Sequence, residues 1–64
     1  MTGAGVAERF QDAIWALEQA AARLRVAATG LELADMPATA RQVTGWAEEA
    51  ERTLGKLTSD LVRS

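Results

Sequence analysis

The sequence predicts an all-α protein, a two-helix antiparallel hairpin that dimerises into a four-helix bundle. Two series of apolar residues follow one another along the chain, each with steps that alternate between four and three positions. This seven-residue period keeps its members on one side of an α-helix and favours a gentle left-handed crossing. The third observation is length. A lone hairpin from a chain of 64 residues buries too little apolar surface to offset the entropy lost on folding, so we expect self-association.

The first series predicts a helix over residues 6–29. Its large members alternate with alanines, so large and small side chains follow one another regularly along the surface that a partner helix would contact. Two glycines and no periodicity in residues 1–5 predict a flexible tail before it. Gly30 predicts the helix end, because glycine readily takes the left-handed backbone conformation that closes helices. The members of the first seam are Val6, Phe10, Ala13, Leu17, Ala20, Leu24, Ala27 and Leu31.

A turn is expected over residues 30–36 and a second helix over residues 37–62. Asp35 is the expected N-cap, with Pro37 in the first helical turn. Gly45 costs a helix about 1 kcal/mol relative to alanine, so a break there is the alternative to one continuous helix. The unbroken apolar spacing favours the continuous helix. The members of the second seam are Met36, Ala40, Val43, Ala47, Ala50, Leu54, Leu57 and Leu61.

Folded back on one another, the two series align without a residue left over, and many pairs set a large side chain against a small one. Both helices also carry apolar or small residues beside the seam, among them Ile14, Ala21 and Trp46. This width is typical of a helix with two neighbours, as in a dimer of hairpins, while a wide core within one hairpin is the alternative. The predicted residues of the core and dimer interface are Phe10, Ile14, Leu17, Ala21, Leu24, Val43, Trp46, Leu54, Leu57 and Leu61.

The same alignment predicts two contacts between the helices outside the seam. Arg23 falls beside Trp46, where a guanidinium over an indole contributes about 0.5 to 1 kcal/mol when exposed. Arg9 falls beside Asp60, and a surface ion pair of this kind contributes less. We expect both contacts to adjust the register of the hairpin without driving its folding.

Trp15, Ala22 and Val26 share the far side of the first helix, and Leu33 joins them if that helix continues far enough. A tryptophan is unusual on a solvated helix face, and aromatic anchors are enriched at protein interfaces. We therefore interpret these four residues as a partner-binding surface. The alternative is that Trp15 lies flat over neighbouring arginine side chains and has no binding role.

The composition argues against several classes of chemistry. The chain has no cysteine and no histidine, which excludes disulfides, zinc ligation through thiolate or imidazole, and histidine acid–base catalysis. Carboxylates do share helix faces, as in Glu8 with Asp12 and Glu48 with Glu51, but the seam positions are apolar. No nucleophile has a plausible base, and no glycine-rich phosphate loop is present. We expect neither a metal, nor a cofactor, nor an enzyme.

Charge and hydropathy bear on the partners. A formal net charge of -2 and arginines spread around both helices argue against a nucleic-acid surface. A dimer could still gather separate arginines into one patch. No run of about 18 apolar residues is present, and the start of the chain lacks the basic and apolar regions of a signal peptide. We therefore expect a cytoplasmic protein that makes no contact with a membrane.

In length and in the spacing of its seams, the chain resembles the Rop-type plasmid copy-control bundles, which are hairpins that dimerise and bind paired RNA loops. The resemblance covers most of the chain but concerns architecture alone, so no residue role follows from it. The residues themselves favour a non-catalytic interaction or regulatory module, a homodimer that binds a protein partner through an outer apolar face. The alternatives are a nucleic-acid-binding regulator of phage or plasmid type, and a small subunit that folds on a larger protein.

Overall fold

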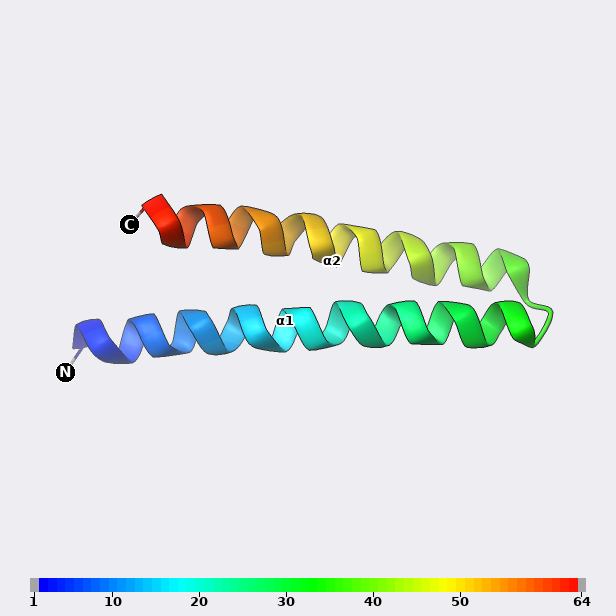
Figure 1. The fold of residues 1–64 in the computed structure, drawn as a ribbon, viewed down its shortest axis with the longest axis horizontal. Coiled ribbons are helices and arrows are strands. Elements are labelled where there is room, and N and C mark those ends of the chain that lie inside the picture. Colours follow the sequence, from blue (N-terminus) through cyan, green and yellow to red (C-terminus); the bar gives the residue numbers. More distant parts are fainter. Residues whose placement is uncertain (1, 64) are drawn as a thin grey trace.

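The computed structural model describes residues 2–63, without the side chains of residues 2–4 and 6, and it confirms an all-helical hairpin. Helix α1 spans Thr2–Leu33 and helix α2 spans Pro37–Arg63. The two helices lie side by side and antiparallel along most of their length, and the N-terminal end of α1 extends past the end of α2 (Figure 1). The molecule measures 50 × 18 × 11 Å, and its shortest dimension is the diameter of one helix. The hairpin is therefore a single layer with two broad faces.

Helix α1 is longer at both ends than the sequence predicts. It begins at Thr2, where a tail was expected over residues 1–5, of which residue 1 lies outside the described part. It also continues through Gly30 to Leu33. No described glycine has a positive φ, so the prediction that Gly30 ends the helix is wrong. The sequence Leu31-Glu32-Leu33 consists of good helix formers, which offset the cost of about 1 kcal/mol for one glycine.

The turn ends α1 with a left-handed residue at Asp35, whose φ is 61°. The backbone N–H of Met36 donates to the carbonyl of Leu31 at 2.9 Å, and that of Asp35 donates to the carbonyl of Glu32 at 3.1 Å. These two bonds form a Schellman motif, in which the left-handed position is usually glycine. Asp35 is thus the residue that ends α1, and the prediction that it is the N-cap of α2 is wrong.

Met36 takes the N-cap position instead. Its carbonyl accepts the first hydrogen bond of α2, from the N–H of Ala40 at 3.0 Å. Pro37 is the first helical residue, as expected, because proline lacks the N–H that this position would leave unpaired. Proline also disfavours the helical conformation in the residue before it, which separates α2 from α1. Helix α2 then continues through Gly45 to Arg63 without the alternative break.

The face of α1 that packs against α2 differs from the predicted seam. The seam alanines Ala13, Ala20 and Ala27 are exposed, whereas Ala21 and Ala28 are buried and Ile14 is half-buried. The helix is therefore rotated about its axis so that the row of Ile14, Ala21 and Ala28 faces α2. Val6, the first member of the predicted seam, has its side chain outside the described part. Half-buried positions on α1 also include Phe10, Leu17, Leu24 and Leu31.

Helix α2 packs through the seam that the sequence predicts, except for Met36, which is exposed. Ala40, Val43 and Ala47 are buried. No buried side chain is larger than valine among the described residues, because a single layer covers each large side chain from one direction only. The half-buried positions of this seam are Ala50, Leu54, Leu57 and Leu61.

Candidate protein-interaction surfaces

The first surface is the predicted partner face on the outer side of α1, which we call the Trp15 stripe: Trp15, Ala22, Val26 and Leu33. Steps of seven, four and seven residues keep these side chains on one line of the helix. All four are exposed. Leu33 belongs to the stripe because α1 continues past Gly30.

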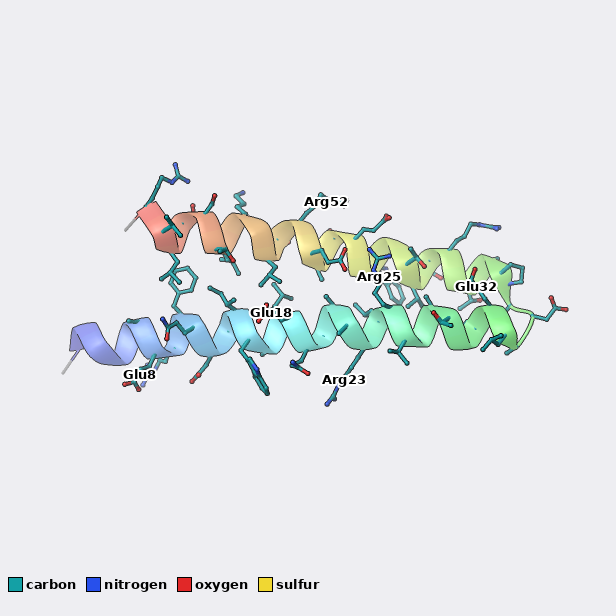
Figure 2. All side chains as sticks on the ribbon, viewed as in Figure 1. Glu8, Glu18, Arg23, Arg25, Glu32 and Arg52 are labelled. Carbon is teal, nitrogen blue, oxygen red and sulfur yellow. The ribbon has the colours of Figure 1, made fainter. Side chains whose placement is uncertain are left out.

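The Trp15 stripe leaves large apolar side chains open to water. The exposed fractions are 63% for Trp15, 72% for Val26 and 85% for Leu33. The alternative, in which Trp15 lies flat over arginine side chains and has no binding role, stays a prediction. Arg23 points away from α2 on the outer side of α1, as Glu8 does (Figure 2). Charged groups therefore border an apolar line, which is the usual anatomy of a protein interface.

The second surface is one broad face of the hairpin, and Arg25 and Glu51 define it. The Arg25 guanidinium donates from Nε and Nη2 to the two carboxylate oxygens of Glu51, at 3.1 and 2.6 Å. Glu18 and Glu32 lie seven residues either side of Arg25, and all three appear on the side of α1 that faces α2 (Figure 2). We call this polar side the Glu51 face.

The ion pair changes the acidity of both partners. The hydrogen bond from Arg25 is the largest effect on the Glu51 carboxyl, and it lowers the pKa of that group. Desolvation opposes this change, and the positive charge of Arg25 adds a smaller lowering of the pKa. The same hydrogen bond raises the pKa of Arg25. Both side chains are nearly half exposed, so the pair orients the helices more than it stabilises the fold.

The opposite broad face is uncharged over the middle of the hairpin, and we call it the Trp46 face: Ala13, Ala20 and Ala27 of α1 with Thr39, Trp46 and Thr53 of α2. On α1 these alanines adjoin the leucine row of Leu17 and Leu24, on the side away from Arg25. On α2 Trp46 adjoins Val43 and Ala50, on the side away from Glu51. The two rows therefore share one face. Trp46 was predicted among the core and interface residues, and it is 51% exposed in the hairpin.

The two predicted contacts outside the seam have different outcomes. Arg23 points away from α2, so it does not stack on Trp46, because the rotation of α1 carries it outward. Asp60 accepts a hydrogen bond from Arg63 at 2.9 Å, within α2. The contact between Arg9 and Asp60 stays a prediction.

The remaining charges are spread over the molecule. Arg52 points away from α1 on the outer side of α2, opposite Arg23 (Figure 2). Over residues 2–63, no three carboxylates gather as a metal ligand set would, and no buried polar side chain is present in the part of the chain that the structure describes. Neither described helix contains a stretch long and apolar enough to cross a membrane.

Sequence reasoning found the Trp15 stripe but did not separate the Trp46 face from the core. The signal that could have separated them is Ile14. It is the one large side chain in the row with Ala21 and Ala28, and a large residue belongs more naturally against the partner helix than an alanine does. Val62, which is 81% exposed, was also not part of any surface predicted from the sequence.

The fold and these surfaces define a helical hairpin with an exposed apolar stripe on α1 and one broad face that is uncharged over the middle of the hairpin. No known protein family, curated protein or solved structure matches the chain.

Proposed function

We propose that the chain is a small non-catalytic interaction module, which acts as a dimer of hairpins and binds another protein through the Trp15 stripe. The observation that carries the proposal is the line of exposed apolar side chains on α1, from Trp15 through Val26 to Leu33. Exposed tryptophan surrounded by polar residues is characteristic of binding hot spots. A helix face that met only water would carry charged residues at these positions.

The surface area of the hairpin supports the dimer. The chain exposes 4945 Å² at a mass of 6.8 kDa. A folded monomer of that mass exposes about 3,950 Å² by the usual scaling with size. The excess is therefore about 1,000 Å² per chain, which is comparable to the roughly 800 Å² that each partner buries in an interface of standard size.

The elongated shape of the hairpin also supports the dimer. The radius of gyration is 15.0 Å, whereas a compact domain of this length has about 10.7 Å. A second hairpin laid on one broad face would convert the single layer into a two-layer bundle with a shared core. The dispersed arginines give less support to the nucleic-acid alternative, since Arg23 and Arg52 point to opposite sides of the hairpin.

A pull-down from lysate with matched variants tests the binding role. Val26→Asp places a charge in the Trp15 stripe, and Val62→Asp places the same charge on an equally exposed valine of α2. We expect a protein to be retained by the wild type and by Val62→Asp, but not by Val26→Asp or Trp15→Ala. Circular dichroism and sedimentation should show the same helicity and mass for all four proteins.

Two results would count against the proposal. One is retention of the same proteins by all variants, and the other is a large fall in the melting temperature of Trp15→Ala, which would make Trp15 a core residue. The salt dependence of binding distinguishes a protein partner from the nucleic-acid alternative, because retention through an apolar interface barely responds to ionic strength. Binding through phosphate contacts falls steeply as salt rises.

A further inference from the structure

We propose that the Trp46 face is covered by a second copy of this chain, with both turns at the same end of the bundle and each Trp46 seated between Ala20 and Ala27 of the other copy. This inference rests on the proposed dimer and adds which face is buried and how the copies are oriented. The Trp15 stripe stays outside the dimer, free for the protein partner.

The two broad faces differ in the cost of burying them. The Glu51 face carries the ion pair of Arg25 with Glu51, flanked by Glu18 and Glu32 (Figure 2). Covering it would remove charged groups from water at a high cost. Over the middle of the hairpin the Trp46 face carries only alanine, threonine and tryptophan in its two exposed rows. One further step of seven residues along α2 reaches Asp60, which pairs with Arg63 near the end of the helix. An isologous dimer brings the same face together twice, so the face without charges at its centre is the one that can meet itself.

The size of the face matches the excess surface of the hairpin. A broad face of 50 × 18 Å has a footprint of about 900 Å², close to the surface that a standard interface buries on each partner. Covering this face would also complete the burial of side chains that are only half-buried in the single layer. These are Leu17, Leu24, Leu31, Ala50 and Leu57.

The two rows of the Trp46 face are complementary in shape. The α1 row consists of Ala13, Ala20 and Ala27, whose small side chains leave room beside Leu17 and Leu24. The α2 row contains Trp46, which is 51% exposed. Packing one copy's α2 on the other copy's α1 sets the large side chain against the small ones, as close packing of helices requires.

The orientation of the copies follows from the level of Trp46 in the hairpin. Trp46 lies eleven residues after Asp35, and Leu24 lies eleven residues before Asp35. Because the chain reverses at Asp35, Trp46 and Leu24 are at the same position along the bundle axis. Ala20 and Ala27 lie on either side of this level. A two-fold axis parallel to the helices keeps these levels and places α2 of one copy on α1 of the other. A two-fold axis perpendicular to the helices would instead pack the alanine row of one copy on the alanine row of the other. Trp46 would then have no small side chains opposite it.

Tryptophan fluorescence tests which face is buried, using Trp15→Phe and Trp46→Phe, each with one remaining tryptophan. In Trp15→Phe we expect the emission of Trp46 to shift to shorter wavelength as the concentration rises, in step with the mass from sedimentation equilibrium. In Trp46→Phe we expect the emission of Trp15 to remain that of an exposed indole. A dimer that buries Trp15 instead would overturn the face assignment. A protein that stays monomeric would overturn the proposed dimer itself.

A pair of charged variants provides the matched control. Ala20 and Ala22 are both exposed alanines of α1, but only Ala20 belongs to the Trp46 face. We expect Ala20→Glu to weaken dimerisation by at least about tenfold, because it buries a charge, and Ala22→Glu to keep the wild-type mass. If the hairpin folds only as a dimer, Ala20→Glu loses helicity together with mass. Wild-type dimerisation of Ala20→Glu would overturn the inference.

A distance between the two turns tests the orientation. The chain has no cysteine, so a spin label attached to Ala34→Cys reports a single position in each copy. Turns at the same end place the labels within about 30 Å, since the bundle is roughly two helix diameters wide. Turns at opposite ends would separate them by nearly the 50 Å length of the hairpin. The longer distance would overturn the same-end arrangement while leaving the dimer and its buried face intact.

Discussion

Arg25 and Glu51 meet across the hairpin although they are not level with one another. Arg25 lies ten residues before Asp35 and Glu51 lies sixteen residues after it, which offsets their Cα atoms by about 9 Å along the bundle at 1.5 Å per residue. Side chains lean towards the N-terminus of their own helix. Because the two helices are antiparallel, the Arg25 and Glu51 side chains tilt in opposite directions along the bundle, each towards the other. They therefore span the offset of about 9 Å between their Cα atoms and form both hydrogen bonds.

This ion pair predicts a pH-dependent contribution to stability. Arg25 holds the pKa of the Glu51 carboxyl below its ordinary value in the folded chain, so the pair stabilises the hairpin at pH values above the ordinary glutamate pKa of about 4.3. The contribution is lost as the pH falls through the lowered pKa. We expect the melting temperature of the wild type to exceed that of Glu51→Gln at pH 7, and the difference to shrink as the pH is lowered through the acidic range. Glu49→Gln, an exposed neighbour on α2, is the control and should show no such convergence.

Gly30→Ala should stabilise the protein by about 1 kcal/mol, because alanine is the better helix former and Gly30 lies within α1. A Cβ atom added at this position has nothing within 4 Å. Urea denaturation followed by circular dichroism measures the change. A destabilised Gly30→Ala would show that the helix closes at this glycine, as its position in the sequence suggests.

Asp35→Gly should also stabilise the protein, by roughly 0.5 to 1 kcal/mol, because glycine takes the left-handed conformation at φ 61° without a steric penalty. Asp35→Ala should have the opposite effect, since alanine has a Cβ and lacks the short polar side chain that makes aspartate tolerable there. Thermal unfolding of the two variants beside the wild type tests the order. Equal melting temperatures for Asp35→Gly and Asp35→Ala would contradict a left-handed residue in the turn.

The rotation of α1 can be tested with two neighbouring alanines. Ala21 is buried against α2 and Ala22 is exposed. Ala21→Leu should destabilise the protein by about 1 to 3 kcal/mol through overpacking, whereas Ala22→Leu should change the free energy of unfolding by less than about 0.5 kcal/mol. Denaturant titrations of both variants give these values. The reverse order would place another face of α1 against α2.

The comparison of the two helices shows how far sequence reasoning extends. Helix α2 has one apolar stripe and a charged outer side, so its packing face was predicted correctly apart from Met36. Helix α1 has alanine rows on both sides of its leucine row. Both Ala20 and Ala21 fit a seven-residue spacing, so periodicity left two faces equally suitable for contact with α2.

The end of α1 was mispredicted for a related reason. Glycine is a common left-handed residue, so Gly30 was the natural choice from local preference. Asp35 takes this conformation instead, because Pro37 fixes the start of α2 and the chain must reverse just before it. Local preference could name candidate residues, but the geometry of the reversal selected among them.

The sequence by itself determined the two helices, the antiparallel hairpin, the packing face of α2 and the exposed position of the Trp15 stripe. These features depend on spacing along a single helix, which the chain specifies locally. Only the tertiary structure decided the rotation of α1 and the exposure of Ala20 and Trp46 on one broad face. The physical reason is that alanine costs little to bury and little to expose, so the choice between two alanine rows rests on the helix packed beside them.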